Sequence, residues 1–290
     1  MKSKIYLILF ALFAFSCSSD SSSDDGNNNN NGGNNNNNNN LENALLVSEI
    51  LVDQGQSGSM NFNYDGNKLT YISRTSDIGD ITLLTFIYTN NKISRIDRSF
   101  DTSQGIYSRW DFSYDNQNRL NYYEHCYLGN NNECDYLNTF SISYSSNNTV
   151  TQNYIYDGTD YIEEGTLTLQ LDNNGNIISG TDTYIDNVSG SPQTISVSGS
   201  FQYDNQNSPF KNITGINALI LQEIISSEYF YLLSFSASNN CVSQNYEDSD
   251  SDDSYSVTYA YDYNNDDYPR QIITYEGDGL NEQIFDISYY

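Results

Sequence analysis

One pattern of hydrophobic and polar positions recurs along the chain from residue 62 onward. Two aromatic or aliphatic residues stand two positions apart, a short run rich in Asn, Asp and Gly follows, and an aliphatic residue comes next. Residues two positions apart lie on the same face of a β-strand, and Asn and Gly tolerate the positive φ of tight turns. Each unit therefore predicts a β-hairpin. The nine units begin at Phe62, Phe86, Phe112, Phe140, Leu169, Phe201, Phe235, Tyr259 and Phe285.

A single hairpin cannot bury its apolar face alone, so neighbouring units must stack and bury the aromatic ladder between them. Nine hairpins correspond to roughly 17 or 18 strands, more than a flat open sheet usually holds. We predict an all-β fold, an antiparallel meander of about nine β-hairpin repeats that forms a curled sheet or barrel-like roll in one domain, residues 41–290. A β-propeller is the alternative. Only Thr214–Ile225 could form a short helix, as an insertion in the longest unit, 201–234.

The first 16 residues have the features of a secretory signal peptide. Lys2 and Lys4 form a charged start, and Ile5–Phe15 is an apolar run that is too short to span a bilayer as a helix. The run ends at Ala14-Phe15-Ser16-Cys17, which resembles a bacterial lipobox and implies lipidation of Cys17. The alternative is an ordinary signal peptide cut before a structural cysteine.

Residues 17–40 are interpreted as the lipidated cysteine followed by a tether. Ser18–Asp25 contains only Ser and Asp, Gly26–Asn40 contains only Asn and Gly, and neither can bury apolar surface. A flexible chain of this length has a reach of about 25 Å. The acidic run after the cysteine resembles the export signal of surface lipoproteins in the Bacteroidetes, which implies an outer-membrane, lipid-anchored protein exposed at the cell surface. A solvated linker facing the periplasm is the alternative.

Three further cysteines remain. Cys126 and Cys134 flank a polar loop, and this spacing lets two hairpin strands bring them within disulfide distance in an oxidising, exported location. A zinc site is disfavoured because His125 is the chain's only histidine and no CxxC motif occurs. Cys241 follows a turn at a position that polar residues fill in other units, which predicts a free, rather exposed thiol.

The acidic run at residues 247–253 is a weak calcium candidate. Asp248, Asp250 and Asp252 alternate as at the start of a calcium-binding loop. The run lacks the glycine and the bidentate glutamate that an EF-hand needs, so a solvated hairpin tip is the favoured interpretation, with weak Ca²⁺ binding as the alternative. No other cofactor and no metal site is expected.

Composition and charge exclude two classes of protein. A formal net charge of −27 leaves no basic footprint for a phosphate backbone, so we expect no nucleic-acid partner. Aromatic residues make up 14% of the chain, too many for a disordered protein. Basic residues are unevenly placed: residues 41–119 hold seven of them against ten acidic residues, and residues 120–290 hold two against twenty-five. Composition drift between repeats is favoured over a polarised binding surface.

No catalytic residue is assigned. The sequence contains no G-x-S-x-G elbow, no P-loop and no G-x-G-x-x-G motif. The pair Glu163-Glu164 would point to opposite faces of a strand, which argues against a paired-carboxylate site.

The units YDGNKL, YDNQNRL and YDNQNSPFKNI resemble the YD-type β-hairpin repeats of Rhs-like shells and of uncharacterised Bacteroidetes-type surface lipoproteins. The resemblance covers about 62–290, implies a hairpin architecture and carries no catalytic residue. It favours a binding or structural module, held to the membrane by its lipid anchor, for an unknown extracellular protein or glycan. A glycan-degrading hydrolase is the alternative.

Overall fold

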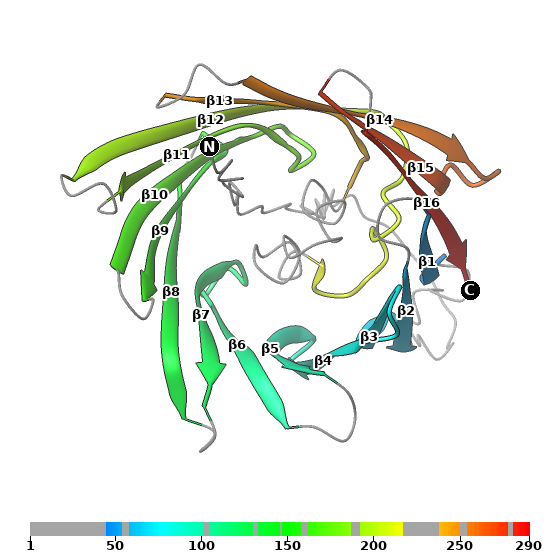
Figure 1. Ribbon diagram of the computed structural model, residues 1–290, viewed down its shortest axis with the longest axis horizontal. Coiled ribbons are helices and arrows are strands. Elements are labelled where there is room, and N and C mark those ends of the chain that lie inside the picture. The colour runs from blue at the N-terminus through cyan, green and yellow to red at the C-terminus, as the bar shows by residue number, and fades with distance from the viewer. Residues whose placement is uncertain are drawn as a thin grey trace, which may run out of the picture.

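The chain forms a closed barrel of sixteen antiparallel strands (Figure 1). The computed structural model describes residues 45–53, 58–100, 105–129, 133–145, 147–157, 162–186, 192–216, 238–249, 254–277 and 281–290. Each strand pairs with its sequence neighbours, and the first pairs with the last to close the ring. The strands are β1 (Val47–Asp53), β2 (Gly58–Asp65), β3 (Lys68–Ser76), β4 (Ile81–Thr89), β5 (Lys92–Ser99), β6 (Ile106–Tyr114), β7 (Leu120–Leu128), β8 (Cys134–Tyr144), β9 (Thr149–Asp157), β10 (Ile162–Leu171), β11 (Ile177–Asp186), β12 (Gln193–Tyr203), β13 (Cys241–Asp248), β14 (Ser254–Tyr263), β15 (Pro269–Glu276) and β16 (Asn281–Tyr289).

The predicted all-β antiparallel meander is confirmed, in its barrel-like form, and the propeller alternative is wrong because all strands belong to one sheet. The strand number is sixteen and not 17 or 18. Eight of the nine units begin on the even-numbered strands, while Phe235 lies outside the described residues. β12 pairs directly with β13, so the long unit contributes β12 to the barrel and no further strand lies between these two. The predicted helix 214–225 lies outside the described residues except for its first three positions.

Six hairpins turn tightly at one end of the barrel, here called the turn end, and the opposite end is the loop end. In three turns the first residue caps the turn with its own side chain. Asp115 Oδ1 accepts from the backbone N–H groups of residues 117 and 119, and Asp172 and Asn264 make the same pair of bonds. Gly66 and Gly175 adopt positive φ angles of 61° and 82° near the turn exit. The Asn/Asp/Gly runs therefore fold as expected from their side-chain chemistry.

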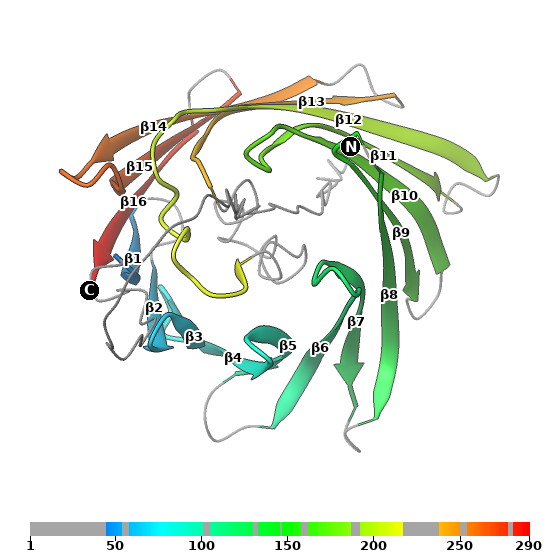
Figure 2. The same ribbon diagram turned by 180° about the vertical axis from the view of Figure 1, so that it is seen from behind.

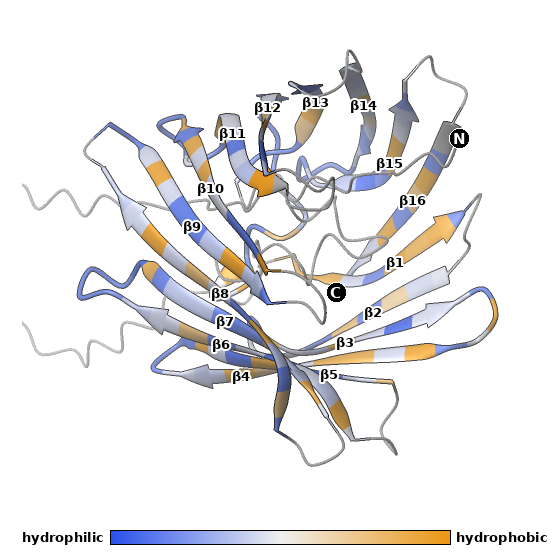
Figure 3. Cartoon of the chain, turned by 60° about the vertical axis from the view of Figure 1, so that its left-hand side comes forward, coloured by the Kyte–Doolittle hydropathy of each residue, from blue (hydrophilic) through white to orange (hydrophobic). Residues whose placement is uncertain are grey.

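Apolar residues of the repeat face the lumen. Residues directly opposite across antiparallel strands share a face, and the ladder positions pair with other buried residues: Phe86 with Ile96, Phe285 with Ile272, and Leu169 with Val150. Figure 3 shows hydrophobic and hydrophilic residues alternating along the strands. The ladder is the core, and all eight described ladder residues are buried: Phe62, Phe86, Phe112, Phe140, Leu169, Phe201, Tyr259 and Phe285.

The segment after β12, residues 204–216, lies inside the ring of strands and is called the plug segment (Figures 1 and 2, yellow). Phe210, Ile213 and Ile216 are buried, and the Phe210 ring lies 6.2 Å from that of Phe62. The backbone N–H of residue 214 donates to the carbonyl of Asn67, 2.8 Å away, in the β2–β3 turn. The side chains of the wall cannot by themselves fill the interior of a barrel as wide as sixteen strands. The plug segment therefore adds apolar side chains to the core.

Neighbouring hairpins are joined at the turn end by repeated contacts, here called tyrosine rungs. In a rung, the tyrosine of one hairpin donates its hydroxyl to the carbonyl of the aliphatic residue of the preceding hairpin. Tyr114 donates to Ile93 at 2.7 Å and Tyr144 donates to Leu120 at 2.5 Å. At three successive hairpins a cation of the preceding turn lies over the tyrosine ring. The pairs are Lys68 over Tyr88 at 5.7 Å, Lys92 over Tyr114 at 4.9 Å and Arg119 over Tyr144 at 4.3 Å.

We predict that Tyr114→Phe lowers the free energy of unfolding by about 1 kcal/mol, because it removes one partly buried hydrogen bond and keeps the ring. Urea denaturation at neutral pH measures the change. Tyr122→Phe is the matched control, since the Tyr122 hydroxyl makes only a 3.3 Å contact with the Glu124 carboxylate on the outward face. Equal losses from both variants would contradict a specific role for the rung.

Candidate functional site

The outer wall of the barrel is polar. Outward positions alternate with the buried ladder, and on β10 to β14 they are mostly hydroxyl and amide residues. These include Thr166, Thr168, Gln170, Ser179, Thr181, Thr183, Thr194, Ser196, Ser198, Ser200, Ser243, Asn245, Ser256 and Thr258. Exposed aliphatic residues such as Leu51, Ile87 and Ile155 lie opposite polar residues on the neighbouring strands. Apolar residues are adjacent on the wall in small groups, with Ala260, Ile273 and Ile284 in one row across β14 to β16 and Ile81 beside Leu83 on β4. The described wall therefore has no continuous apolar band of the kind that faces lipid in a membrane-spanning barrel.

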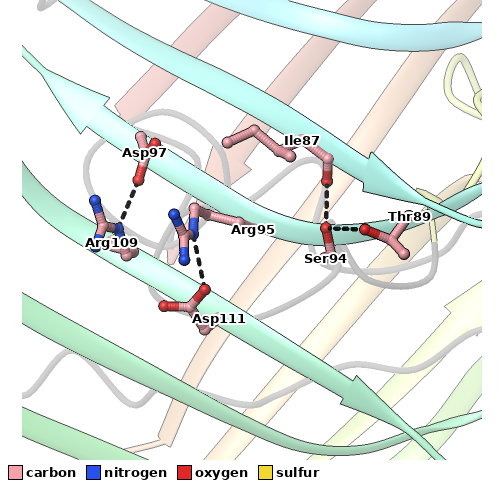
Figure 4. A network of polar contacts seen from close by, with 7 residues as sticks. All are labelled: Ile87, Thr89, Ser94, Arg95, Asp97, Arg109 and Asp111. Atoms are coloured by element: carbon pink, nitrogen blue, oxygen red, sulfur yellow. Dashed lines mark hydrogen bonds and ion pairs between the residues drawn. The ribbon is translucent and has the colours of Figure 1, made fainter.

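Charged residues on the outer wall pair with one another across β5 and β6 (Figure 4). Arg95 lies opposite Asp111 with a 2.8 Å contact, and Arg109 lies opposite Asp97 with a 2.9 Å contact. Next to Arg95 in the sequence, the Ser94 hydroxyl donates a hydrogen bond to the Ile87 carbonyl and accepts one from the Thr89 hydroxyl. Arg95 and Arg109, which belong to the basic-rich part of the sequence at residues 41–119, thus pair with acidic residues on the same two strands.

Both ends of the described barrel domain meet at the turn end. The backbone N–H of Tyr290 donates to the Leu46 carbonyl at 2.9 Å, and the Asn212 amide of the plug segment donates to the Leu45 carbonyl at 2.9 Å. The Tyr290 hydroxyl donates to the Phe62 carbonyl at 3.0 Å. The chain that precedes residue 45 therefore joins the barrel at the turn end, and the loop end is the far end from that junction.

A hollow of about 250 Å³ opens at the turn end between the β6–β7, β8–β9 and β10–β11 turns. Val150 and Leu171 are the buried apolar residues that line it. Its other sides are polar: Arg119, Tyr144, Ser145, Asn148, Thr149, Asp172, Asn173 and Gly175. We refer to this space as the turn-end hollow.

A buried carboxyl group lies on the inner wall. Asp182 on β11 pairs with Leu167 and Val197, and it is 6% exposed. The Tyr154 hydroxyl donates to both of its carboxylate oxygens at 3.1 Å. Gly165 makes room for the Tyr154 ring, because a Cβ at residue 165 would lie 2.2 Å from the ring. Burial, and secondly the charge of Glu163, raise the pKa of Asp182 to about 7 against the lowering effect of the Tyr154 hydrogen bond.

The structure brings few of the sequence candidates together. Cys17, Asp250 and Asp252 lie outside the described residues, and Asp248 is the last residue of β13. Within the described ranges, no three His, Cys, Asp or Glu side chains gather where they could hold a metal ion. No helix in the described part of the chain is long and apolar enough to cross a membrane.

The cysteines differ in their surroundings. Cys126 on β7 and Cys134 on β8 form a disulfide, with their Cα atoms 5.3 Å apart. The prediction that Cys241 is exposed is wrong, because Cys241 is buried and lies opposite Tyr203. In other units an aliphatic residue lies opposite the tyrosine, as Ile93 lies opposite Tyr88. Cys241 takes this aliphatic position, one residue earlier than the sequence pattern predicted. The Sγ of Cys241 contacts the Ser243 carbonyl at 3.3 Å.

Sequence reasoning missed both the turn-end hollow and Asp182. A signal for the hollow is present in the repeat itself, since Leu171 stands where other units have tyrosine and Thr149 stands where three units have Lys or Arg. Alternation from Ile177 would place Ser179 and Thr181 inward, but a bulge between Ile177 and Ser179 shifts the strand by one residue. Asp182 therefore faces inward only in the observed pairing with Leu167, and the sequence pattern carries no signal for it.

We predict that Asp182→Asn removes a pH-dependent destabilisation. The native pKa lies above the usual 3.8, so the unfolded chain loses its proton first and stability falls as the pH rises from about 4 to about 7. A shift of this size corresponds to at most about 4 kcal/mol. The variant should gain in free energy of unfolding at pH 8 relative to pH 4.5, measured by urea denaturation. Asp266→Asn, in an exposed turn, is the matched control, and a parallel pH dependence of D182N and wild type would refute the role of Asp182.

We predict that the three cysteines of the barrel resist alkylation in the native, unreduced protein. Cys126 and Cys134 are bonded, and burial raises the pKa of the Cys241 thiol to about 12, so little reactive thiolate is present. Iodoacetamide labelling followed by peptide mass spectrometry should modify Cys241 after unfolding and the other two only after reduction. Rapid labelling of Cys126 and Cys134 without reductant would rule out the bond.

No protein-family model matches the sequence, and no curated protein matches it. Two solved structures align with most of the chain. A porin-like protein from Bacteroides vulgatus aligns over 85% of this chain and 99% of its own, with 14% identity and a TM-score of 0.56. A porin-like protein from Bacteroides uniformis aligns over 84% and 98%, with 12% identity and a TM-score of 0.38. The sixteen-stranded barrel thus has the fold of the Bacteroides vulgatus porin-like protein.

Proposed function

We propose that the protein is a lipid-anchored barrel that stands in water at the outer membrane, exposed at the cell surface, and serves as a binding or structural module for an extracellular protein or glycan. The observation that carries this proposal is the polar outer wall. It is joined by the position of Leu45 and Leu46, which are bonded to Asn212 and Tyr290 at the turn end, so a tether that precedes them would leave the barrel at that end.

The wall argues for water as its solvent. Burying charged groups such as Arg95 and Asp111 in lipid costs about 2 to 4 kcal/mol for an Arg at the bilayer midplane, and the hydroxyl rows of β10 to β14 provide no compensating apolar area. In water the same wall is favourable, because its hydroxyl, amide and charged groups are solvated or paired. The apolar groups face the lumen instead, which is the reverse of a membrane-spanning barrel.

The fold similarity to a protein named porin-like supports an outer-membrane setting without requiring a pore. In this chain the lumen is lined mainly by buried aromatic and aliphatic residues, with polar residues such as His125, Gln152 and Gln244 among them. The plug segment adds Phe210, Ile213 and Ile216. A water-filled passage needs a polar interior. The packed interior favours a rigid scaffold whose ends present contacts.

A Cys17 lipid anchor predicts that the barrel's ends have different surroundings. The turn end would lie toward the membrane within reach of the tether, and the loop end would point toward solvent and other cells. Contacts with large partners therefore fit best on the connections at the loop end, which can vary without disturbing the ladder. The strongly acidic composition leaves nucleic acid as a poor partner.

A glycan-degrading hydrolase is a weaker candidate. Asp182 with its raised pKa is the one observation in its favour. The carboxyl group is buried against Leu167 and Val197 and holds the Tyr154 hydroxyl, which fits a structural role in the inner wall.

We predict that Cys17→Ala releases the full chain from the membrane fraction of a Bacteroidetes host, because the wall itself has no affinity for lipid. Cell fractionation with a carbonate wash and immunoblotting measures the release, and protease added to intact cells tests surface exposure. Ser18→Ala is the matched control and should leave the protein in the membrane. Retention of C17A after the wash would show that the barrel is embedded and would overturn the proposal.

A further inference from the structure

The turn-end hollow occupies the place of a missing tyrosine rung. In three successive hairpins a cation and a tyrosine ring fill the space between neighbouring turns, ending with Arg119 over Tyr144. In the next hairpin pair, Thr149 replaces the cation and Leu171 replaces the tyrosine, each at the same register position. Thr149 is followed by Val150 opposite Tyr144, as Arg119 is followed by Leu120 opposite Tyr114.

Leucine in place of tyrosine at residue 171 removes both the volume of the aromatic ring and a hydrogen-bond donor. Leu171 has no ring to extend over the turn and no hydroxyl to donate to the carbonyl of Val150, the acceptor that corresponds to Ile93 and Leu120 in the two preceding rungs. The space that remains measures about 250 Å³, and the Leu171 backbone N–H instead donates to the Asn148 carbonyl at 2.9 Å. The hollow thus lies where the preceding rungs place a ring that carries a hydroxyl group.

We propose that the turn-end hollow binds one pyranose ring of a glycan. Its volume is below that of pockets for drug-sized ligands, which limits the occupant to a single ring. Val150 and Leu171 offer an apolar floor for the C–H face of a sugar. Around this floor stand groups that can bond hydroxyls on several sides, which suits a ring with a hydroxyl on nearly every carbon better than it suits an apolar ring.

The polar rim has unused bonding capacity. The side-chain amides of Asn148 and Asn173 are exposed and make no hydrogen bond with other described residues, so each has a donor and an acceptor for a sugar hydroxyl. The Asp172 carboxylate already accepts from its own turn but retains lone pairs on both oxygens. The Thr149 hydroxyl is occupied by Gln170, which fixes the rim next to the floor.

This proposal rests on the binding role given under Proposed function and names a ligand class for the turn end, a contact separate from the large partners assigned there to the loop end; it does not depend on the lipid anchor. A single ring with a few hydrogen bonds predicts a Kd on the order of 1 mM. Saturation-transfer NMR on the full chain, held in a detergent without sugar groups, tests it with methyl glycosides of glucose, galactose, mannose and N-acetylglucosamine. N-acetyltyrosinamide is added as a probe for a peptide side chain.

The decisive variant restores the rung. Leu171→Tyr with Thr149→Lys should fill the hollow, keep the unfolding midpoint at or above that of wild type, and weaken sugar binding by at least about tenfold. Asn173→Ala should weaken it by about three- to tenfold through loss of one hydrogen bond. Ser113→Lys adds the same charge on the outward face of β6 and serves as the matched control, with binding unchanged.

Three results would overturn the inference. One is the absence of binding for all four glycosides, and another is binding of N-acetyltyrosinamide alone, which would favour a peptide partner. The third is glycoside binding that the folded L171Y/T149K variant retains in full. That last result would leave the proposed binding module standing, since the sugar would bind elsewhere on the barrel, whereas failure of the anchor is detected independently by fractionation of C17A.

Discussion

A ring of sixteen strands encloses a wide space, and the structure depends on filling that space with apolar groups. Small barrels of about eight strands are filled by their own wall side chains, but wider ones leave a channel unless something else enters. Here large aromatic side chains and the plug segment share the task. Trp110, Tyr123 and Phe140 are almost fully buried, and Phe210 and Ile213 approach from the segment after β12. The high aromatic content of the chain follows from this demand for volume.

The inward packing also determines the chemistry of the outside. Side chains alternate between the two faces of a strand, so a wall that sends its apolar residues inward must present its other residues outward. The result is an outer surface of hydroxyl, amide and paired charged groups, as at Arg109 and Asp97. Barrels of the same topology can thus be suited to lipid or to water according to which face carries the apolar residues. Fold similarity to a porin-like protein specifies the topology and leaves that choice to the sequence.

Much of the fold could be predicted from the sequence because the repeat carries local information. The spacing of Phe112 and Tyr114 and the Asp-led turn after them determine a strand, a face and a turn, without reference to distant parts. The displacement of Cys241 could not be predicted, because only the pairing with Tyr203 shows which residue takes the buried position. Phe235, which begins the seventh unit, lies outside the described residues, so the strand expected there stays a prediction. The turn-end hollow depends on comparing neighbouring hairpins, so it becomes visible only when the tyrosine rungs are seen side by side.

Closure of the ring by β1 and β16 has a consequence for biogenesis. Val52 lies opposite Phe285, so the seam joins the two ends of the domain and cannot form until the last strand has been synthesised. Until then, two strand edges stay open, each with unpaired backbone groups that another chain could pair with. Contacts so distant in sequence also form slowly. The period before closure is therefore when the protein is most exposed to aggregation, and a chaperone that shields strand edges would act on this seam.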